Sequence, residues 1–193
     1  MRPEIVFLLE EPSAKAMLET LLPRILDPQL RHRLIPFEGK QDLEKQLERK
    51  LRGYLNPDAR FLIMRDQDSH ADCKALKGTL LAKCVAAGKG EVSLVRIACR
   101  ELESFYLADL AAVESAFGVA GLSKLQGNAK YRDPDRLGSP SKELNELTRG
   151  KYQKVGGSRA LGSSLNLDNT RSDSFSNLIQ GIRRLERQLL NRS

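Results

Sequence analysis

The stretch Arg60-Phe61-Leu62-Ile63-Met64-Arg65-Asp66-Gln67-Asp68 decides the fold, because a short apolar run ends directly in two carboxylates. A run without polar alternation is typical of a strand that is buried on both faces of a parallel sheet. Similar runs end at Glu10, after residues 4–9, and at the Glu-Leu-Glu of 101–103, after residues 92–98. The carboxyl ends of parallel strands meet at one edge of an open α/β sheet, where ligands bind. We therefore expect the three acidic spots to converge at one crevice.

Strand and helix patterns alternate along the first two-thirds of the chain. The expected strands cover residues 4–10, 32–37, 60–66 and 92–98. The helices expected between them begin at Pro12 and cover about 41–54 and 70–87. Repeated βα units with short connections predict a mostly parallel sheet with helices on its faces. The expected fold class is α/β, with four strands.

The pattern becomes helical from Glu101 onward, and the first of these helices is expected to end near Gly118. Residues 121–141 are polar and irregular. Further helices are expected at about 140–149, 152–165 and 172–191. We expect an α/β core over residues 1–117 and a helical extension over residues 118–193 that packs on it as a single compact unit.

Basic residues are concentrated in the last third of the chain. The 193 residues carry a net charge of +7, and residues 128–193 contain 13 Lys and Arg against 7 Asp and Glu. A basic end beside an acidic crevice suits a phosphate-rich partner such as nucleic acid. The alternative is a solvated basic helical surface that binds nothing.

The composition also bears on location. No apolar run is long enough to span a membrane, and the N-terminus does not resemble a signal peptide. Cys73, Cys84 and Cys99 are odd in number and lack a CxxC spacing, which fits reduced thiols in a cytoplasmic protein. A zinc site is not expected, since the chain contains only His32 and His70.

The Asp-Gln-Asp of residues 66–68 places two carboxylates on one side of an extended segment, because side chains alternate at period two. Clustered carboxylates repel one another, and a hard divalent cation such as Mg²⁺ reverses that balance. The alternative is a polar connection in which Asp68 or Ser69 caps the next helix. The flanking Arg65 and Asp72 fit solvated side chains. Glu10 and the 101–103 acids also fit first helical turns, where the helix dipole favours acids.

Several basic residues of the extension are candidates for phosphate contacts, with a solvated side chain as the alternative for each. They are Lys142, Lys151, Lys154, Arg159 and Arg171. Gly156-Gly157 and Gly162 resemble a flexible loop, and their spacing does not match a Walker-type phosphate loop.

The acidic pattern resembles the Toprim catalytic domain of topoisomerases, primases and overcoming-lysogenization-defect nucleases. That domain, a Rossmann-like fold, has a glutamate after its first strand, often followed by glycine, and an Asp-x-Asp after a later strand. Glu10 corresponds to the glutamate, and Asp66 and Asp68 correspond to the Asp-x-Asp. Glu11 stands where that domain usually has glycine, so the turn there is expected to differ in shape.

The whole chain more closely resembles DUF4276, a bacterial Toprim-like family. The similar segments are Leu9-Glu10-Glu11-Pro12-Ser13, Phe37-Glu38-Gly39-Lys40-Gln41-Asp42-Leu43, Asp66-Gln67-Asp68-Ser69, Arg100-Glu101-Leu102-Glu103-Ser104-Phe105-Tyr106-Leu107-Ala108-Asp109, Pro140-Ser141-Lys142, Tyr152-Gln153-Lys154 and Arg171-Ser172-Asp173-Ser174-Phe175.

The resemblance implies a nuclease or related phosphoryl-transfer enzyme that depends on Mg²⁺ or Mn²⁺ and acts on nucleic acid. The metal ligands would be Glu10, Asp66, Asp68 and Glu103, and Glu101 would join them as a catalytic residue. The nucleic-acid contacts would be Lys142, Lys154, Arg159 and Arg171. Analogy with Toprim nucleases further implies action beside an ATPase encoded nearby, in phage defence. The alternative is a non-catalytic Toprim-like module that binds a partner protein or nucleic acid.

Overall fold

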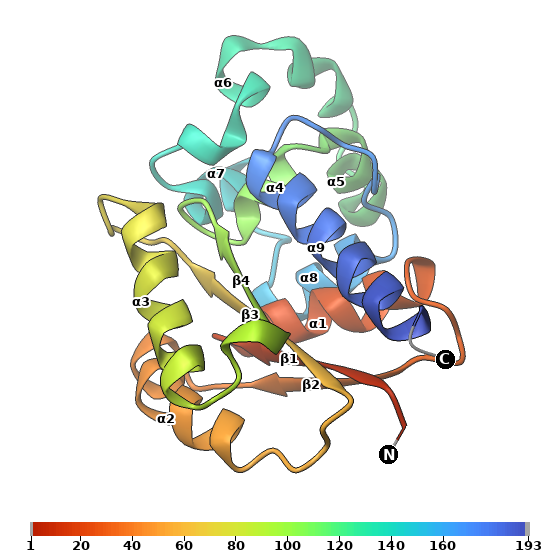
Figure 1. The fold of residues 1–193 in the computed structure, drawn as a ribbon. Coiled ribbons are helices and arrows are strands. Elements are labelled where there is room, and N and C mark those ends of the chain that lie inside the picture. Colours follow the sequence, from red (N-terminus) through yellow and green to blue (C-terminus); the bar gives the residue numbers. More distant parts are fainter. Residues whose placement is uncertain (1, 192–193) are drawn as a thin grey trace.

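A parallel four-stranded sheet forms the centre of the molecule, in a computed structural model that describes residues 2–191 (Figure 1). The strands are β1 (Glu4–Leu9), β2 (Arg31–Pro36), β3 (Ala59–Asp66) and β4 (Ser93–Ala98), in the order β2-β1-β3-β4. Every neighbouring pair is parallel. The predicted α/β class, with four parallel strands, is therefore confirmed.

The helices and short 3-10 turns follow the strands in chain order. They are α1 (Pro12–Leu21), η1 (Leu22–Arg24), α2 (Lys40–Arg52), α3 (Cys73–Ala86), η2 (Gly90–Val92), α4 (Glu103–Leu107), α5 (Leu110–Phe117), η3 (Ser123–Gly127), α6 (Ala129–Arg132), η4 (Pro134–Arg136), α7 (Pro140–Leu147), α8 (Lys154–Gly162) and α9 (Asp173–Leu190). Within residues 2–191, no strand follows Ala98. None of the helices in that range is long and apolar enough to cross a membrane.

The strand side chains alternate between two apolar cores, one on each face of the sheet. Val6 and Ile63 belong to the core beneath α2 and α3, whereas Phe7 and Met64 belong to the core beneath α1 and α9. Both faces are buried, which explains why these strands are apolar without interruption. Figure 1 shows α2 and α3 together on one side of the sheet and α1 and α9 on the other.

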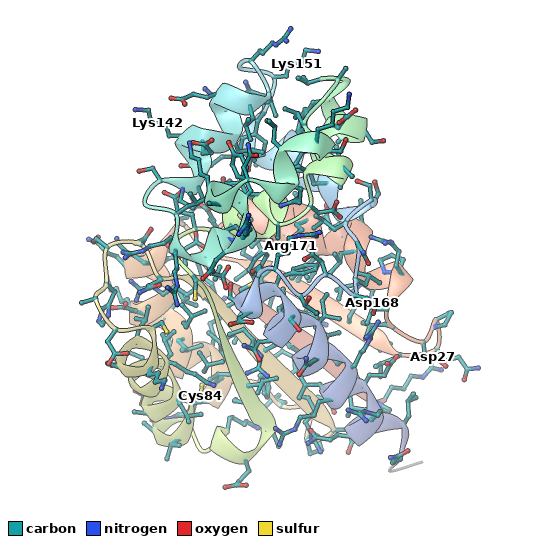
Figure 2. All side chains as sticks on the ribbon, turned by 90° about the horizontal axis from the view of Figure 1, so that it is seen from above. Asp27, Cys84, Lys142, Lys151, Asp168 and Arg171 are labelled. Atoms are coloured by element: carbon teal, nitrogen blue, oxygen red, sulfur yellow. The ribbon has the colours of Figure 1, made fainter. Side chains whose placement is uncertain are left out.

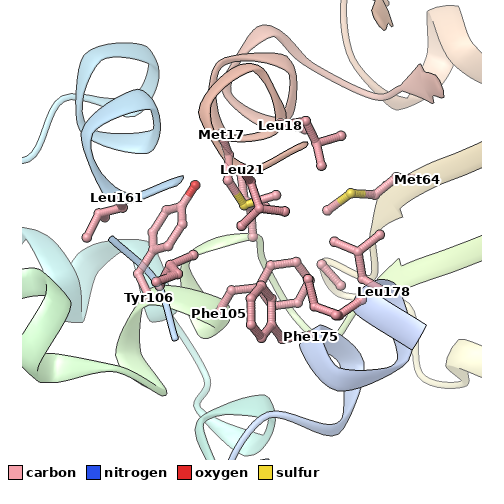
Figure 3. Close-up of a cluster of buried hydrophobic side chains, with 14 of the residues drawn as sticks. Met17, Leu18, Leu21, Met64, Phe105, Tyr106, Leu161, Phe175 and Leu178 are labelled. Carbon is pink, nitrogen blue, oxygen red and sulfur yellow. The ribbon is translucent and has the colours of Figure 1, made fainter. Parts of the chain in front are cut away.

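The larger core joins the first and last parts of the chain. Phe105 of α4 packs on Phe175 of α9 with 5.2 Å between ring centroids. Leu161 of α8 and Tyr106 of α4 belong to the same buried cluster as Met17 of α1 (Figure 3). The helices after residue 117 thus complete a core that the sheet and α1 begin.

The helix expected at about 152–165 is present as α8, so the interpretation of Gly156-Gly157 and Gly162 as a flexible loop is wrong. A Cβ at Gly162 would lie 2.2 Å from the Met17 carbonyl oxygen and 2.4 Å from Thr20 Oγ1. Glycine therefore lets α8 cross α1 at close backbone contact. Thr20 also donates a hydrogen bond of 2.8 Å to the Arg159 carbonyl oxygen across this crossing.

The helix expected from Glu101 to Gly118 is interrupted at Asp109. One carboxylate oxygen of Asp109 accepts a hydrogen bond from Ala112 N at 3.1 Å and caps α5. The other accepts from Asn166 N at 2.8 Å. A side chain that serves two segments distant in sequence leaves no periodic signal, so the interruption could not be seen in the pattern.

Candidate functional site at the carboxyl edge of the sheet

Glu10 follows β1, Asp66 is the last residue of the neighbouring strand β3, and the two residues are in direct contact. Glu10 Oε2 accepts a hydrogen bond of 2.8 Å from the Asp66 backbone N–H. Arg65 Nε lies 3.8 Å from the same oxygen, and the Arg65 guanidinium also pairs with Glu44. The expectation of a solvated Arg65 is therefore wrong: this residue is 6% exposed. The positive charge of this buried side chain neutralises part of the negative charge of the acidic edge.

Three carboxyl groups at this edge have raised pKa values. Burial raises the pKa of Asp66 well above its ordinary value of 3.8, and the charges of Glu10, Glu103 and Glu11 add to the shift. Burial also raises the pKa of Glu10, with an opposing contribution from the Asp66 N–H. Burial likewise raises the pKa of Glu103, which is 1% exposed. Negative charge is therefore costly here without a compensating cation.

The hydroxyl of Tyr152 holds Glu103 in place. It donates a hydrogen bond of 2.8 Å to Glu103 Oε1 and lies 3.3 Å from Ser158 Oγ. Tyr152 precedes α8, and its backbone N–H donates to Thr148 Oγ1 at 3.1 Å. The role of Tyr152 could not be predicted from the sequence, where it stands only in a segment similar to the family, since no local pattern connects it with Glu103.

Lys154 brings a positive charge to the same acids. Its Nζ lies 3.5 Å from Glu11 Oε2. Burial lowers the pKa of Lys154, but the charges of Glu11, Glu103 and Asp66 outweigh that effect and leave the pKa raised. Glu11, which stands where the Toprim pattern usually has glycine, is thus a member of the acidic cluster.

Asp68 turns away from Asp66 toward a different partner. The extended strand ends at Asp66, and Asp68 has a left-handed φ of 53°. Its Oδ2 lies 3.0 Å from Lys40 Nζ. The next helix is capped by Asp72, which accepts hydrogen bonds from Lys74 N and Ala75 N, and not by Asp68 or Ser69. The expectation of a merely solvated Asp72 is therefore also wrong.

Two left-handed residues face each other where β3 and β4 end. Asp68 N donates a hydrogen bond of 2.7 Å to the carbonyl oxygen of Arg100, whose φ is 64°. Residues other than glycine adopt this conformation at an energetic cost, and such strain concentrates at functional sites. Shallow hollows of 320 and 340 Å³ lie beside Asp68, the first lined also by Glu10 and Lys40, the second by Arg100 and Glu101.

Glu101 anchors the helical extension to this edge. Its Oε2 accepts a hydrogen bond of 2.7 Å from Ser141 N, in the first turn of α7. The exposed Lys142 is therefore carried next to the Glu101 contact. Two further basic candidates, Arg159 and Arg171, bind partners outside the acidic cluster. Arg159 pairs with Glu19 of α1 at 2.9 Å, and the Arg171 guanidinium contacts the Ala108 carbonyl oxygen at 3.4 Å.

Lys151, the fifth basic candidate, binds the C-terminal end of α5. Its Nζ donates a hydrogen bond of 3.0 Å to the Phe117 carbonyl oxygen. Figure 2 shows Lys142 and Lys151 on the outer margin of the helical part, away from Arg171. Among the five basic candidates, only Lys154 is ion-paired with a member of the acidic cluster.

The donor set suits a hard cation, but its side chains are turned to internal partners. Glu10 binds the Asp66 N–H, Glu103 binds Tyr152, and Asp68 binds Lys40. In the part of the chain that the structure describes, no three Asp, Glu, His or Cys side chains are arranged to hold a metal ion as they stand. The donor atoms of these side chains are all carboxylate oxygens, which are the ligands that Mg²⁺ and Mn²⁺ prefer.

The fold and this edge define a Toprim-like α/β domain. The structure is similar to the C-terminal region of the Burkholderia pseudomallei OLD protein, with a TM-score of 0.55, 16% identity and coverage of 93% of this chain and 97% of that one. Residues 9–183 match the family described as "Domain of unknown function (DUF4276)". The chain belongs to that family, as its motifs predicted. Among curated proteins there is no match to this chain.

Proposed function

We propose that this protein is a nuclease, or a closely related phosphoryl-transfer enzyme, that uses Mg²⁺ or Mn²⁺ and acts on nucleic acid. The observation that carries the proposal is the group of three adjacent acids with raised pKa values, Glu10, Asp66 and Glu103. Burial makes negative charge on these carboxylates costly, the charges of Glu10 and Glu103 add to that cost at Asp66, and a divalent cation would relieve it. The position of this group at the carboxyl edge of a parallel sheet supports the proposal, because ligands bind there in open α/β sheets.

In this proposal Glu10, Asp66, Asp68 and Glu103 hold the metal. A bound divalent ion supplies charge neutralisation at a phosphate and lowers the pKa of a water molecule. Tyr152 orients Glu103 through its hydrogen bond of 2.8 Å. Glu101 is a positioning residue, because its carboxylate fixes the first turn of α7 through Ser141 N at 2.7 Å.

The two lysines at this edge have a role that follows from their contacts. Lys154 pairs with Glu11, and Lys40 pairs with Asp68. With a divalent cation bound nearby, Glu11 and Asp68 would hold these lysines less strongly, and both ammonium groups would become available. Each could then bind a substrate phosphate, together with Lys142 beside the Glu101 contact. Arg159 and Arg171 would contact more distant parts of a long substrate.

Wider aspects of the proposal rest on analogy with Toprim nucleases. They are action beside an ATPase, a role in phage defence and a cytoplasmic location. The free state of Cys73, Cys84 and Cys99 is compatible with that location. We also propose the division into an α/β core to residue 117 and a helical extension after it.

A non-catalytic Toprim-like module is the second candidate. The ion pair between Glu11 and Lys154 favours it, because the lysine compensates part of the acidic charge without any metal. In this case the edge would bind a partner protein or nucleic acid but would cleave nothing.

Cleavage of labelled DNA and RNA with Mg²⁺, Mn²⁺ or EDTA separates the two candidates. We expect metal-dependent cleavage by the wild type and none by Asp66→Asn or Glu103→Gln. Glu48→Gln is the matched control, because Glu48 lies on α2 and, among residues 2–191, its ion pair is with Arg52. Cleavage that persists in Asp66→Asn would reject the proposed site, and binding without cleavage in every metal would favour the second candidate.

A further inference from the structure

Four arginines surround a groove that lies outside the acidic edge. Arg183, Arg184 and Arg187 project from the last three turns of α9, and Arg96 projects from β4 beside them. They line a groove of about 590 Å³ together with Ile25 and Gln180. Arg183, Arg184 and Arg187 are exposed on the outer face of the helix.

Little negative charge compensates these arginines. The carboxylate of Glu186, which also lines the groove, accepts a hydrogen bond of 2.6 Å from Asp27 N. Arg183 lies 3.7 Å from Asp168, a carboxylate that is itself largely exposed. Neither Arg184 nor Arg187 has an ion pair with any residue from 2 to 191. Figure 2 shows Asp27 and Asp168 on the same side of α9.

Arg96 is fixed at the groove by the packing of α9 on β4. A Cβ at Gly181 would lie 2.8 Å from Arg96 Nε and 2.8 Å from Leu94 Cδ2, so the helix rests directly on the strand. Arg96 Nε donates a hydrogen bond of 2.8 Å to the Asn177 carbonyl oxygen. Burial lowers the pKa of Arg96, and the charge of Arg184 lowers it further, as expected of guanidinium groups that repel one another.

The groove is separate from the acids that the proposed chemistry uses. In the sheet, Arg96 lies opposite Met64, and Ala98 lies opposite Asp66. Arg96 thus stands two residues before the end of β4. The first turn of α9 contacts the end of β4, where Cys99 N donates to Ser174 Oγ at 3.2 Å. From there α9 runs toward the amino ends of the strands, and Leu189 and Leu190 reach a hollow lined by Arg2 and Pro3. We therefore expect substitutions in the last turns of α9 to leave the acidic edge unchanged.

We propose that the groove lined by Arg96, Arg183, Arg184 and Arg187 binds the phosphate backbone of a polynucleotide, as a second contact surface outside the acidic edge. The inference rests on the proposed function for the nature of the ligand, and it requires no metal. Guanidinium groups bind phosphates through paired N–H donors, which a cluster of four arginines offers several times over. Residues 183 to 187 span about 6 Å along the helix axis. That length covers about two phosphates of one strand, spaced about 3.4 Å along the duplex axis.

Binding measurements in EDTA test this groove without any cleavage. Fluorescein-labelled DNA and RNA oligonucleotides, single-stranded and duplex, are titrated with wild type, with Arg184→Gln/Arg187→Gln and with Lys74→Gln/Lys77→Gln. The control pair removes two exposed charges from α3, on the other face of the sheet. We expect the arginine variant to bind more weakly, with a salt slope of log affinity reduced by about 1.4–1.8 for two lost phosphate contacts. The lysine variant should match the wild type.

Three results would overturn the inference. The first is an arginine variant with the same affinity and salt slope as the wild type. The second is a lysine control that loses as much affinity as the arginine variant. The third is polyglutamate that binds as tightly as the oligonucleotides and loses as much affinity in the arginine variant. A wild type that cleaves nucleic acid but whose binding ignores Arg184 and Arg187 would reject only the groove. A wild type that binds through the groove but never cleaves would reject only the proposed chemistry.

Discussion

The hydroxyl of Tyr152 donates a hydrogen bond of 2.8 Å to Glu103, across 49 residues of sequence. Both side chains are buried, with 6% exposure for Tyr152 and 1% for Glu103. This contact joins the helical extension to an acid at the carboxyl edge of the sheet. A buried carboxylate is tolerated only when its oxygens have partners.

Tyr152→Phe removes this partner and keeps the ring. We expect a loss of about 1–3 kcal/mol in the free energy of unfolding, because the buried Glu103 oxygen loses its donor. Urea denaturation at neutral pH measures the loss. A double-mutant cycle with Glu103→Gln shows whether the loss belongs to this pair, and fully additive effects would contradict the coupling.

Asp66→Asn should change how stability depends on pH in metal-free protein. The pKa of Asp66 is raised in the folded state, so the folded protein holds this proton over a pH range in which the unfolded chain has released it. Stability from this group is present below its ordinary pKa of 3.8 and is lost as pH rises through the folded pKa.

The variant should therefore equal the wild type in stability near the acid end and exceed it at neutral pH. Denaturation in EDTA at a series of pH values measures the difference. A wild type that is more stable than Asp66→Asn at neutral pH would mean that the ionised carboxylate is well compensated in the metal-free protein.

Gly162→Ala should destabilise the crossing of α1 and α8. An added Cβ would meet the Met17 carbonyl oxygen at 2.2 Å, and a backbone atom cannot move as a flexible side chain does. We expect a loss of about 1–3 kcal/mol, the usual range for overpacking. Gly156→Ala is the control in the same helix, since its Cβ meets nothing within 4 Å. That substitution should raise stability by up to about 1 kcal/mol through helix propensity.

A fragment of residues 1–117 should not fold alone. Met17 and Phe105 lie in the core that Leu161 and Phe175 complete, so the fragment would expose a large apolar surface to water. We expect no cooperative thermal transition by circular dichroism, in contrast with the full chain. A fragment that melts cooperatively would show that the α/β core is an independent domain.

The sheet could be predicted from the sequence because each strand carries its own signal. The run from Phe61 to Met64 is apolar on both faces, and the two cores of the structure explain why. The same reasoning predicts that Glu10 and Asp66 lie at one edge of the sheet, since the carboxyl ends of parallel strands meet there.

The partners of those acids could not be predicted, because they come from distant segments. Lys154 reaches Glu11 across 143 residues, and no local period records such a contact. The role of Gly162 could not be predicted for a related reason: glycine is needed there because the backbone of α1 lies against it, and the local pattern does not contain α1. The burial of Arg65 could not be predicted either, because its partner Glu44 comes from α2.

Calorimetric titration of Mn²⁺ into the metal-free protein tests the central claim most directly, namely that the acids at the carboxyl edge form a divalent-cation site. We expect saturable binding by the wild type, equal binding by the Glu48→Gln control, and loss of that binding in Asp66→Asn. Thermal stability should rise with Mn²⁺ concentration in the same proteins that bind it, because the ion binds only the folded state. A wild type without saturable binding, or an Asp66→Asn variant that binds Mn²⁺ as the wild type does, would contradict the account.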